Sequence, residues 1–233
     1  MLNDHDPASR LAIALDTDSL DQAVSWARAV QGVFGIAKVG LQLFSAHGPD
    51  AVYRLKDLGF EIFLDLKLHD IPVTVEKAAQ VIARLGVSMT TVHSAGGVEM
   101  VKAALAGLRE GSGGDGTTGP KLLGVTVLTS VAGVSDDDLE MRISILREAG
   151  AIGLVCAPTD LAFVNSLAPE FFKVVPGIRR KEDALGDQAR VAGPDEAIAA
   201  GADVLVVGRP ITSSRNPRSA AEEVRNLVEF ASK

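Results

Sequence analysis

The chain is poor in cysteine, in aromatic residues and in positive charge, and it has no long hydrophobic run. Its single cysteine excludes an intrachain disulfide and fits a reducing cytoplasm. A net charge of −7 without a basic block argues against nucleic acid or an anionic membrane as a partner. No apolar run approaches the roughly 20 residues that span a bilayer, and the N-terminus lacks the basic-then-apolar order of a signal peptide. We therefore expect a cytoplasmic protein without a membrane segment.

Familiar metal, nucleotide and nucleophile motifs are also absent. The four histidines show no zinc-type spacing, and there is no CxxC, HExxH or GxxxxGK[ST] sequence. No serine or cysteine stands in a nucleophile elbow. Asp65 and Asp70 are carboxylates that would suit Mg²⁺, but Lys67 lies between them and would repel the ion. We expect no metal and no cofactor.

Three further residues that carry reactive groups are interpreted as structural. Cys156 lies in the apolar run GLVCA and is expected to be a buried small hydrophobe. His93 ends an apolar run and is expected to form a hydrogen bond with the loop backbone, although acid–base chemistry is an alternative. His69 is interpreted as a loop residue rather than a base.

Eight short apolar runs alternate with amphipathic segments from one end of the chain to the other. This order is typical of a parallel sheet closed into a TIM (β/α)8 barrel, predicted here as a single domain over residues 1–233. An open, doubly wound α/β sheet is the alternative, because strand order cannot be read from sequence. The expected strands are 11–16, 35–40, 61–67, 88–93, 122–128, 153–157, 172–177 and 203–208, and the expected helices are 19–30, 48–58, 73–85, 97–110, 136–149, 159–168, 194–200 and 218–231.

Two connecting segments stand out. The Gly-rich stretch 111–120 is predicted to be a surface loop without chemistry. The link over 178–191 is the longest that follows a strand, and long loops in compact domains are often lids or binding loops.

The run EIFLDLKLHDIPVTV places charges inside one of the most apolar segments. Because strand side chains alternate between two faces, Asp65 and Lys67 are expected to point to the same side. Asp70 adds a second carboxylate just before Pro72, which is expected to open a helix. A structural ion pair is one interpretation. A functional pocket is the stronger one, because buried opposite charges are costly unless they face polar surroundings.

Polar residues at the carboxyl ends of the strands are the candidates for a site in such a barrel. Gly208 and Arg209 follow the eighth strand, where barrels often bind phosphate through backbone N–H groups. Arginine adds a forked, permanently charged donor. Arg179 and Gln188, on the preceding link, are within reach of the same ligand.

The run LDLKLHDIPVTV resembles the signature of the orotidine 5′-phosphate decarboxylase family, D-x-K-x-x-D followed by Ile, Pro or Gly, any residue, and Thr. Further blocks look like those of the family in its order. They are ALD at 14–16, KVG at 38–40, VLTS at 127–130, PGIR at 176–179, GDQ at 186–188 and VVGRPI at 206–211. Departures are small: Val73 stands where many members have asparagine, and the stretch 111–119 looks like a local variation.

The resemblance implies conversion of orotidine 5′-monophosphate to uridine 5′-monophosphate and CO₂, the last step of de novo UMP synthesis, without metal or cofactor. Lys67 would stabilise the carbanion at C6 and protonate it, with Asp65 holding Lys67 charged. Asp70 would come from the neighbouring subunit of a homodimer, and Lys38 would bridge the charged array to the ribose.

Other positions are implied to bind substrate. Asp16 would accept from ribose hydroxyls, and Thr129 would recognise the pyrimidine edge. Ile71 and Thr74 would reach the neighbouring subunit's site. The remaining implied binding residues are Pro176, Arg179, Gln188, Gly208 and Arg209. Two alternatives stay open: a Mg²⁺-dependent sugar-phosphate decarboxylase or aldolase with a similar strand, and a barrel that binds nucleotide monophosphates without catalysis.

Overall fold

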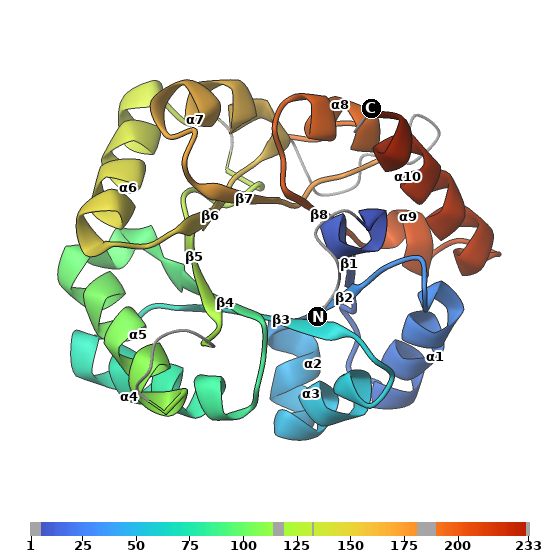
Figure 1. Cartoon of the computed structure of the whole chain (residues 1–233), viewed down its shortest axis with the longest axis horizontal. Helices are drawn as coiled ribbons and strands as arrows, with labels where there is room; N and C mark the ends of the chain where they lie inside the picture. The colour runs from blue at the N-terminus through green and yellow to red at the C-terminus, as the bar shows by residue number, and fades with distance from the viewer. Residues whose placement is uncertain (1–5, 114–118, 132, 181–189, 232–233) are drawn as a thin grey trace.

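The computed structural model describes residues 6–113, 119–131, 133–180 and 190–231. Within these ranges eight parallel strands close into a barrel, each hydrogen-bonded to the next in chain order and the last to the first. Figure 1 looks along the barrel, with the strands as an inner ring. The strands are β1 (Leu11–Ala14), β2 (Ile36–Gly40), β3 (Glu61–Leu68), β4 (Met89–His93), β5 (Lys121–Val125), β6 (Gly153–Val155), β7 (Phe172–Val175) and β8 (Val204–Val207). The TIM barrel is confirmed and the open sheet is wrong.

Helices form the outer ring of Figure 1. They are α1 (Leu20–Val30), α2 (Leu41–His47), α3 (Pro49–Lys56), α4 (Pro72–Arg84), α5 (Gly97–Gly111), α6 (Asp136–Ala149), α7 (Leu161–Leu167), α8 (Pro194–Ala199), α9 (Arg209–Thr212) and α10 (Pro217–Ala231), with short 3₁₀ turns at Pro7–Arg10, Ser94–Gly96 and Pro158–Asp160. Among the described residues, no helix is both long enough and apolar enough to cross a membrane.

Two layers of apolar side chains hold the rings together. The larger layer lies between strands and helices and includes Leu64 and Val92. The smaller fills the barrel interior and includes Phe63 and Met89. Because neighbours along one strand belong to different layers, both faces of each strand are covered, which explains the nearly continuous apolar runs.

Local signals in the sequence set several helix ends. The Ser19 hydroxyl accepts from the Gln22 N–H at the start of α1, and the Ser135 hydroxyl accepts from the Asp138 N–H at the start of α6. Such caps satisfy backbone donors that have no partner within the helix. Pro72 begins α4, as the sequence predicts.

The structure corrects some predicted boundaries. β5 ends at Val125 and β6 at Val155, so the last residues of the expected strands 122–128 and 153–157 form loops at the barrel mouth. Helix α2 was not expected, since it is short and has no side-chain cap. Residues 114–118 lie outside the described residues, so the prediction of a surface loop over 111–120 stays a prediction.

Candidate active site

A cavity of about 480 Å³ opens where the strands end. It is bounded by residues from both sides of the barrel mouth, including the ends of β1, β3, β5 and β8. Predicted site residues that line it are Asp16, Lys38, Asp65, Lys67, Thr129, Pro176, Arg179, Gly208 and Arg209. The tertiary structure thus brings together residues that are nearly 200 positions apart in the chain.

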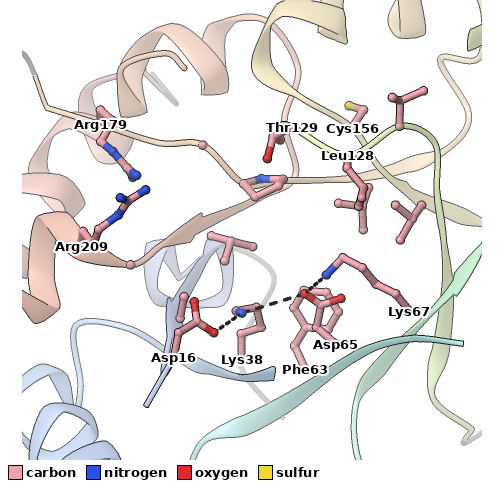
Figure 2. Close-up of a pocket in the computed structure, with 18 of the residues that line it drawn as sticks. Asp16, Lys38, Phe63, Asp65, Lys67, Leu128, Thr129, Cys156, Arg179 and Arg209 are labelled. Atoms are coloured by element: carbon pink, nitrogen blue, oxygen red, sulfur yellow. Dashed lines mark hydrogen bonds and ion pairs between the residues drawn. The ribbon is translucent and has the colours of Figure 1, made fainter. Parts of the chain in front are cut away.

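Four charged side chains form a row of alternating sign along one wall (Figure 2). Lys38 Nζ lies 2.8 Å from Asp16 Oδ1 and 4.0 Å from Asp65 Oδ2. Lys67 Nζ lies 2.7 Å from the same Asp65 oxygen. The side chains of Lys38 and Asp65 are each 11% exposed, whereas that of Lys67 is 31% exposed. Each charge thus lies beside one of opposite sign, and Lys67 is the more accessible of the two ammonium groups.

Lys67 has an unusual backbone. Its φ is +51°, and no other described residue apart from glycines has a positive φ. The register between β3 and β4 shifts between Leu64 and Leu68, but Asp65 and Lys67 both face the cavity, as the alternation along the strand predicts. Left-handed backbone at such a residue costs of the order of 1–3 kcal/mol and tends to occur at functional sites.

Two arginines occupy the other end of the cavity. Arg209 begins α9 directly after Gly208, and Figure 2 shows its guanidinium group beside that of Arg179, on the side of the cavity opposite Lys67. Arg179 is buried; its Nη1 donates to the Ile178 carbonyl at 2.8 Å and its backbone N–H donates to the Ala192 carbonyl at 3.0 Å. The cavity therefore has one end with two guanidinium groups and one end with the Asp65–Lys67 pair.

The apolar wall between these ends was not predicted. It comprises Ala14, Phe63, Val125, Val127, Leu128, Val155 and Val206, and Thr212 and Gly177 also line the cavity. The position of most of these residues near the carboxyl ends of strands was the only signal in the sequence that they could line a site. Apolar residues at such positions cannot be told from core residues by sequence. Cys156 also faces the cavity; it is buried, and burial raises the pKa of its thiol to about 12. The prediction of a buried cysteine is confirmed.

Some predicted residues lie elsewhere. Asp70, Ile71 and Thr74 are exposed and outside the cavity, and Asp70 Oδ1 accepts from the Ile71 N–H at 2.7 Å. Gln188 and most of the 178–191 link lie outside the described residues. The roles implied for these residues stay predictions.

Both histidines have the structural placement expected from the sequence. His69 lies in the loop after β3, and His93 Nδ1 accepts from the Ala95 N–H at 3.3 Å. Their rings stack with centroids 5.4 Å apart, a contact that the sequence did not reveal. Burial lowers the pKa of His93, and the positive charges of His69, Arg142 and Lys67 lower it further. No group of three or more His, Cys, Asp or Glu residues in the described part of the chain is arranged to hold a metal ion.

Comparisons with known proteins agree with this geometry. The model of the Orotidine 5'-phosphate decarboxylase / HUMPS family matches residues 9–224. The chain is 45% identical to an orotidine 5'-phosphate decarboxylase of Anaeromyxobacter sp. (strain K), with 94% of this chain and 97% of that protein covered. It is 44% identical to one of Synechococcus sp. (strain WH7803), covering 92% and 93%. The solved structure of the enzyme from Lactobacillus acidophilus is similar, with a TM-score of 0.79, 34% identity, and 94% of this chain and 99% of that one covered.

Proposed function

Because this chain belongs to the Orotidine 5'-phosphate decarboxylase / HUMPS family, we propose that it converts orotidine 5′-phosphate to uridine 5′-phosphate and CO₂, the last step of de novo UMP synthesis. The observation that carries the proposal is the row Asp16, Lys38, Asp65 and Lys67 in a cavity whose opposite end bears two arginines. A substrate with a reacting carboxylate at one end and a phosphate at the other fits this cavity, with the carboxylate near Lys67 and the phosphate near the two arginines.

Lys67 is the proposed acid. The bond between pyrimidine C6 and the carboxylate carbon breaks, CO₂ leaves, and the electron pair stays on C6. The Lys67 ammonium stabilises this charge and then donates a proton to C6, and solvent reprotonates the amine. Asp65 supports this role because its Oδ2, 2.7 Å from Lys67 Nζ, pairs with the ammonium group and fixes its direction.

The other end of the cavity is the proposed phosphate site. Arg209 and the Gly208 N–H bind the phosphate, with Arg179 beside them and Gln188 reaching between phosphate and base. Asp16 and Lys38 bind the ribose, and Thr129, with Pro176, contacts the pyrimidine. Binding energy from a phosphate remote from C6 can contribute to transition-state stabilisation as well as to affinity.

We propose that the functional unit is a homodimer, in which Asp70, Ile71 and Thr74 complete the neighbouring site. Two large apolar residues in this segment support the proposal: Ile71 is 62% exposed and Val73 is 50% exposed. Exposed apolar side chains gathered on one segment are typical of an interface. We also propose one catalytic domain over residues 1–233 and a cytoplasmic location, the latter supported by the single cysteine.

A decarboxylation assay in chelator tests the proposal and separates it from its rivals. Purified enzyme with EDTA is expected to consume orotidine 5′-phosphate. The loss of the substrate's absorbance measures this consumption. Activity that EDTA abolishes would favour the Mg²⁺-dependent alternative, and no activity with or without Mg²⁺ would favour a barrel that only binds nucleotides. Lys67→Ala is expected to abolish turnover, whereas Lys102→Ala, at an exposed lysine paired with Glu99, should retain it.

Mixed dimers test the shared site. Lys67→Ala and Asp70→Ala homodimers are each expected to be inactive. After subunit exchange, hybrid dimers should regain activity, because one of their two sites then carries both native residues. Absence of rescue, with exchange demonstrated by tagged subunits, would place the complete site within one chain.

A further inference from the structure

We propose that Thr91 of β4 is a positioning residue that fixes Asp65 and Lys67 in their reactive arrangement; this inference rests on the proposed function. Thr91 does not line the cavity, and it is fully buried, with 0% of its surface exposed. It therefore acts through the two charged residues rather than on the substrate.

A single hydroxyl group joins the two charged residues. Thr91 Oγ1 donates to Asp65 Oδ1 at 3.0 Å and accepts from the backbone N–H of Lys67 at 2.8 Å. The other carboxylate oxygen, Oδ2, accepts from Lys67 Nζ at 2.7 Å. The contacts close a ring in which the lysine is held at both ends, by its backbone nitrogen and by its ammonium group.

The backbone conformation of Lys67 explains why this hydroxyl is needed. The left-handed φ of +51° and the register shift against β4 remove the lysine from the regular ladder between the strands. A backbone N–H that is buried without an acceptor is costly, so the shifted lysine requires an acceptor other than a strand carbonyl. A hydroxyl is able to donate and accept at once, and a valine of nearly the same shape does neither.

The neighbouring residue of the same strand offers a matched control. Thr90 is also fully buried, and its Oγ1 also bonds to β3, but it donates to the Leu64 carbonyl at 2.9 Å instead of to Asp65. Thr90→Val therefore removes a buried hydroxyl from β4 without touching the charged row. Its effect measures what the loss of a threonine hydroxyl from this strand does to the fold alone.

Steady-state kinetics of the full-length enzyme with orotidine 5′-phosphate, together with melting temperatures, test the inference. Thr91→Val is expected to lower kcat by up to about 100-fold, the scale on which small displacements of reacting groups act, with little change in KM. Thr91→Ser should restore most of kcat because it restores the hydroxyl. Thr90→Val should retain the kcat of the parent enzyme even where its melting temperature falls.

Two results would overturn the inference while leaving the proposed function intact: Thr91→Val with the kcat of Thr90→Val, or Thr91→Ser no more active than Thr91→Val. If Thr91→Val does not fold, Thr91→Cys replaces it, since a thiol donates and accepts weakly; equal kcat values for Thr91→Cys and Thr91→Ser would then refute the role. An inactive parent enzyme refutes the proposed function instead.

Discussion

Arg190 and Asp160 form a buried ion pair, with Nη1 of the guanidinium 2.7 and 2.6 Å from the two carboxylate oxygens. Their side chains are 11% and 8% exposed. Nη2 of Arg190 donates to the Leu128 carbonyl at 2.9 Å, and Leu128 lines the cavity. The pair thus ties the segment before α8 to the residues that follow β6 and β5.

Removing one partner of this pair should destabilise the fold strongly. Arg190→Met is expected to lower the free energy of unfolding by about 3–5 kcal/mol, because it leaves the Asp160 carboxylate buried without its partner. Urea unfolding measures the change. Lys102→Met, which breaks the exposed pair with Glu99, should have little effect, since exposed ion pairs contribute little. Equal losses in the two variants would contradict this account.

A methyl group at Gly40 should disturb the charged row without unfolding the protein. A Cβ built there lies 2.9 Å from Asp16 Oδ1 and 3.0 Å from Lys38 Nζ, and both atoms are at the ends of flexible side chains. We expect Gly40→Ala to melt near the parent temperature but to raise KM by roughly tenfold, about 1.4 kcal/mol, because the Asp16–Lys38 pair moves. The matched control is Ala37→Gly, which lies on the same strand as Gly40, β2. Gly32→Ala would not serve as a control, because Gly32 has a positive φ that an alanine rarely adopts. A parental KM in Gly40→Ala would show that the pair is not needed for binding.

Arg209→Ala should weaken binding of phosphorylated ligands selectively. Hydrogen bonds to charged groups contribute about 1.5–3 kcal/mol, so the dissociation constant of uridine 5′-monophosphate is expected to rise roughly 10- to 100-fold. Uridine, which lacks the phosphate, provides the control and should bind both proteins equally. Calorimetric titration of the two ligands measures both values. An equal loss for uridine would move Arg209 out of the phosphate site.

Acid should destabilise the protein through His93. Burial lowers the pKa of His93 below 6.5, so between the lowered pKa and 6.5 the unfolded chain binds more protons than the folded one. The contribution of His93 is therefore fully present above pH 6.5 and is lost as the pH falls through that window. In His93→Gln, which keeps an acceptor for the Ala95 N–H, the free energy of unfolding should depend less on pH between about pH 5 and 7. Urea titrations at several pH values give this slope, and an unchanged slope would exclude His93 as its source.

The strand and helix order could be predicted because it follows from local physical chemistry. Strands covered on both faces need continuous apolar runs, and helices between them need amphipathic ones. The Asp65–Lys67 pair was recognisable because two charges inside an apolar run demand a polar setting. Strand ends were less predictable: Val127 and Leu128 are as apolar as β5 itself, but β5 ends at Val125 and both residues line the cavity.

The sequence by itself determined the alternation of strands and helices, the charged residues at the strand ends and the family resemblance, since each depends on neighbours in the chain. Tertiary structure alone decided that Lys38 and Lys67 share one oxygen of Asp65, that Thr91 links this carboxylate to the lysine backbone, and that Arg190 reaches Asp160. Those contacts join different strands and loops. Their geometry depends on barrel closure and on the register shift in β3, which no local pattern in the chain encodes.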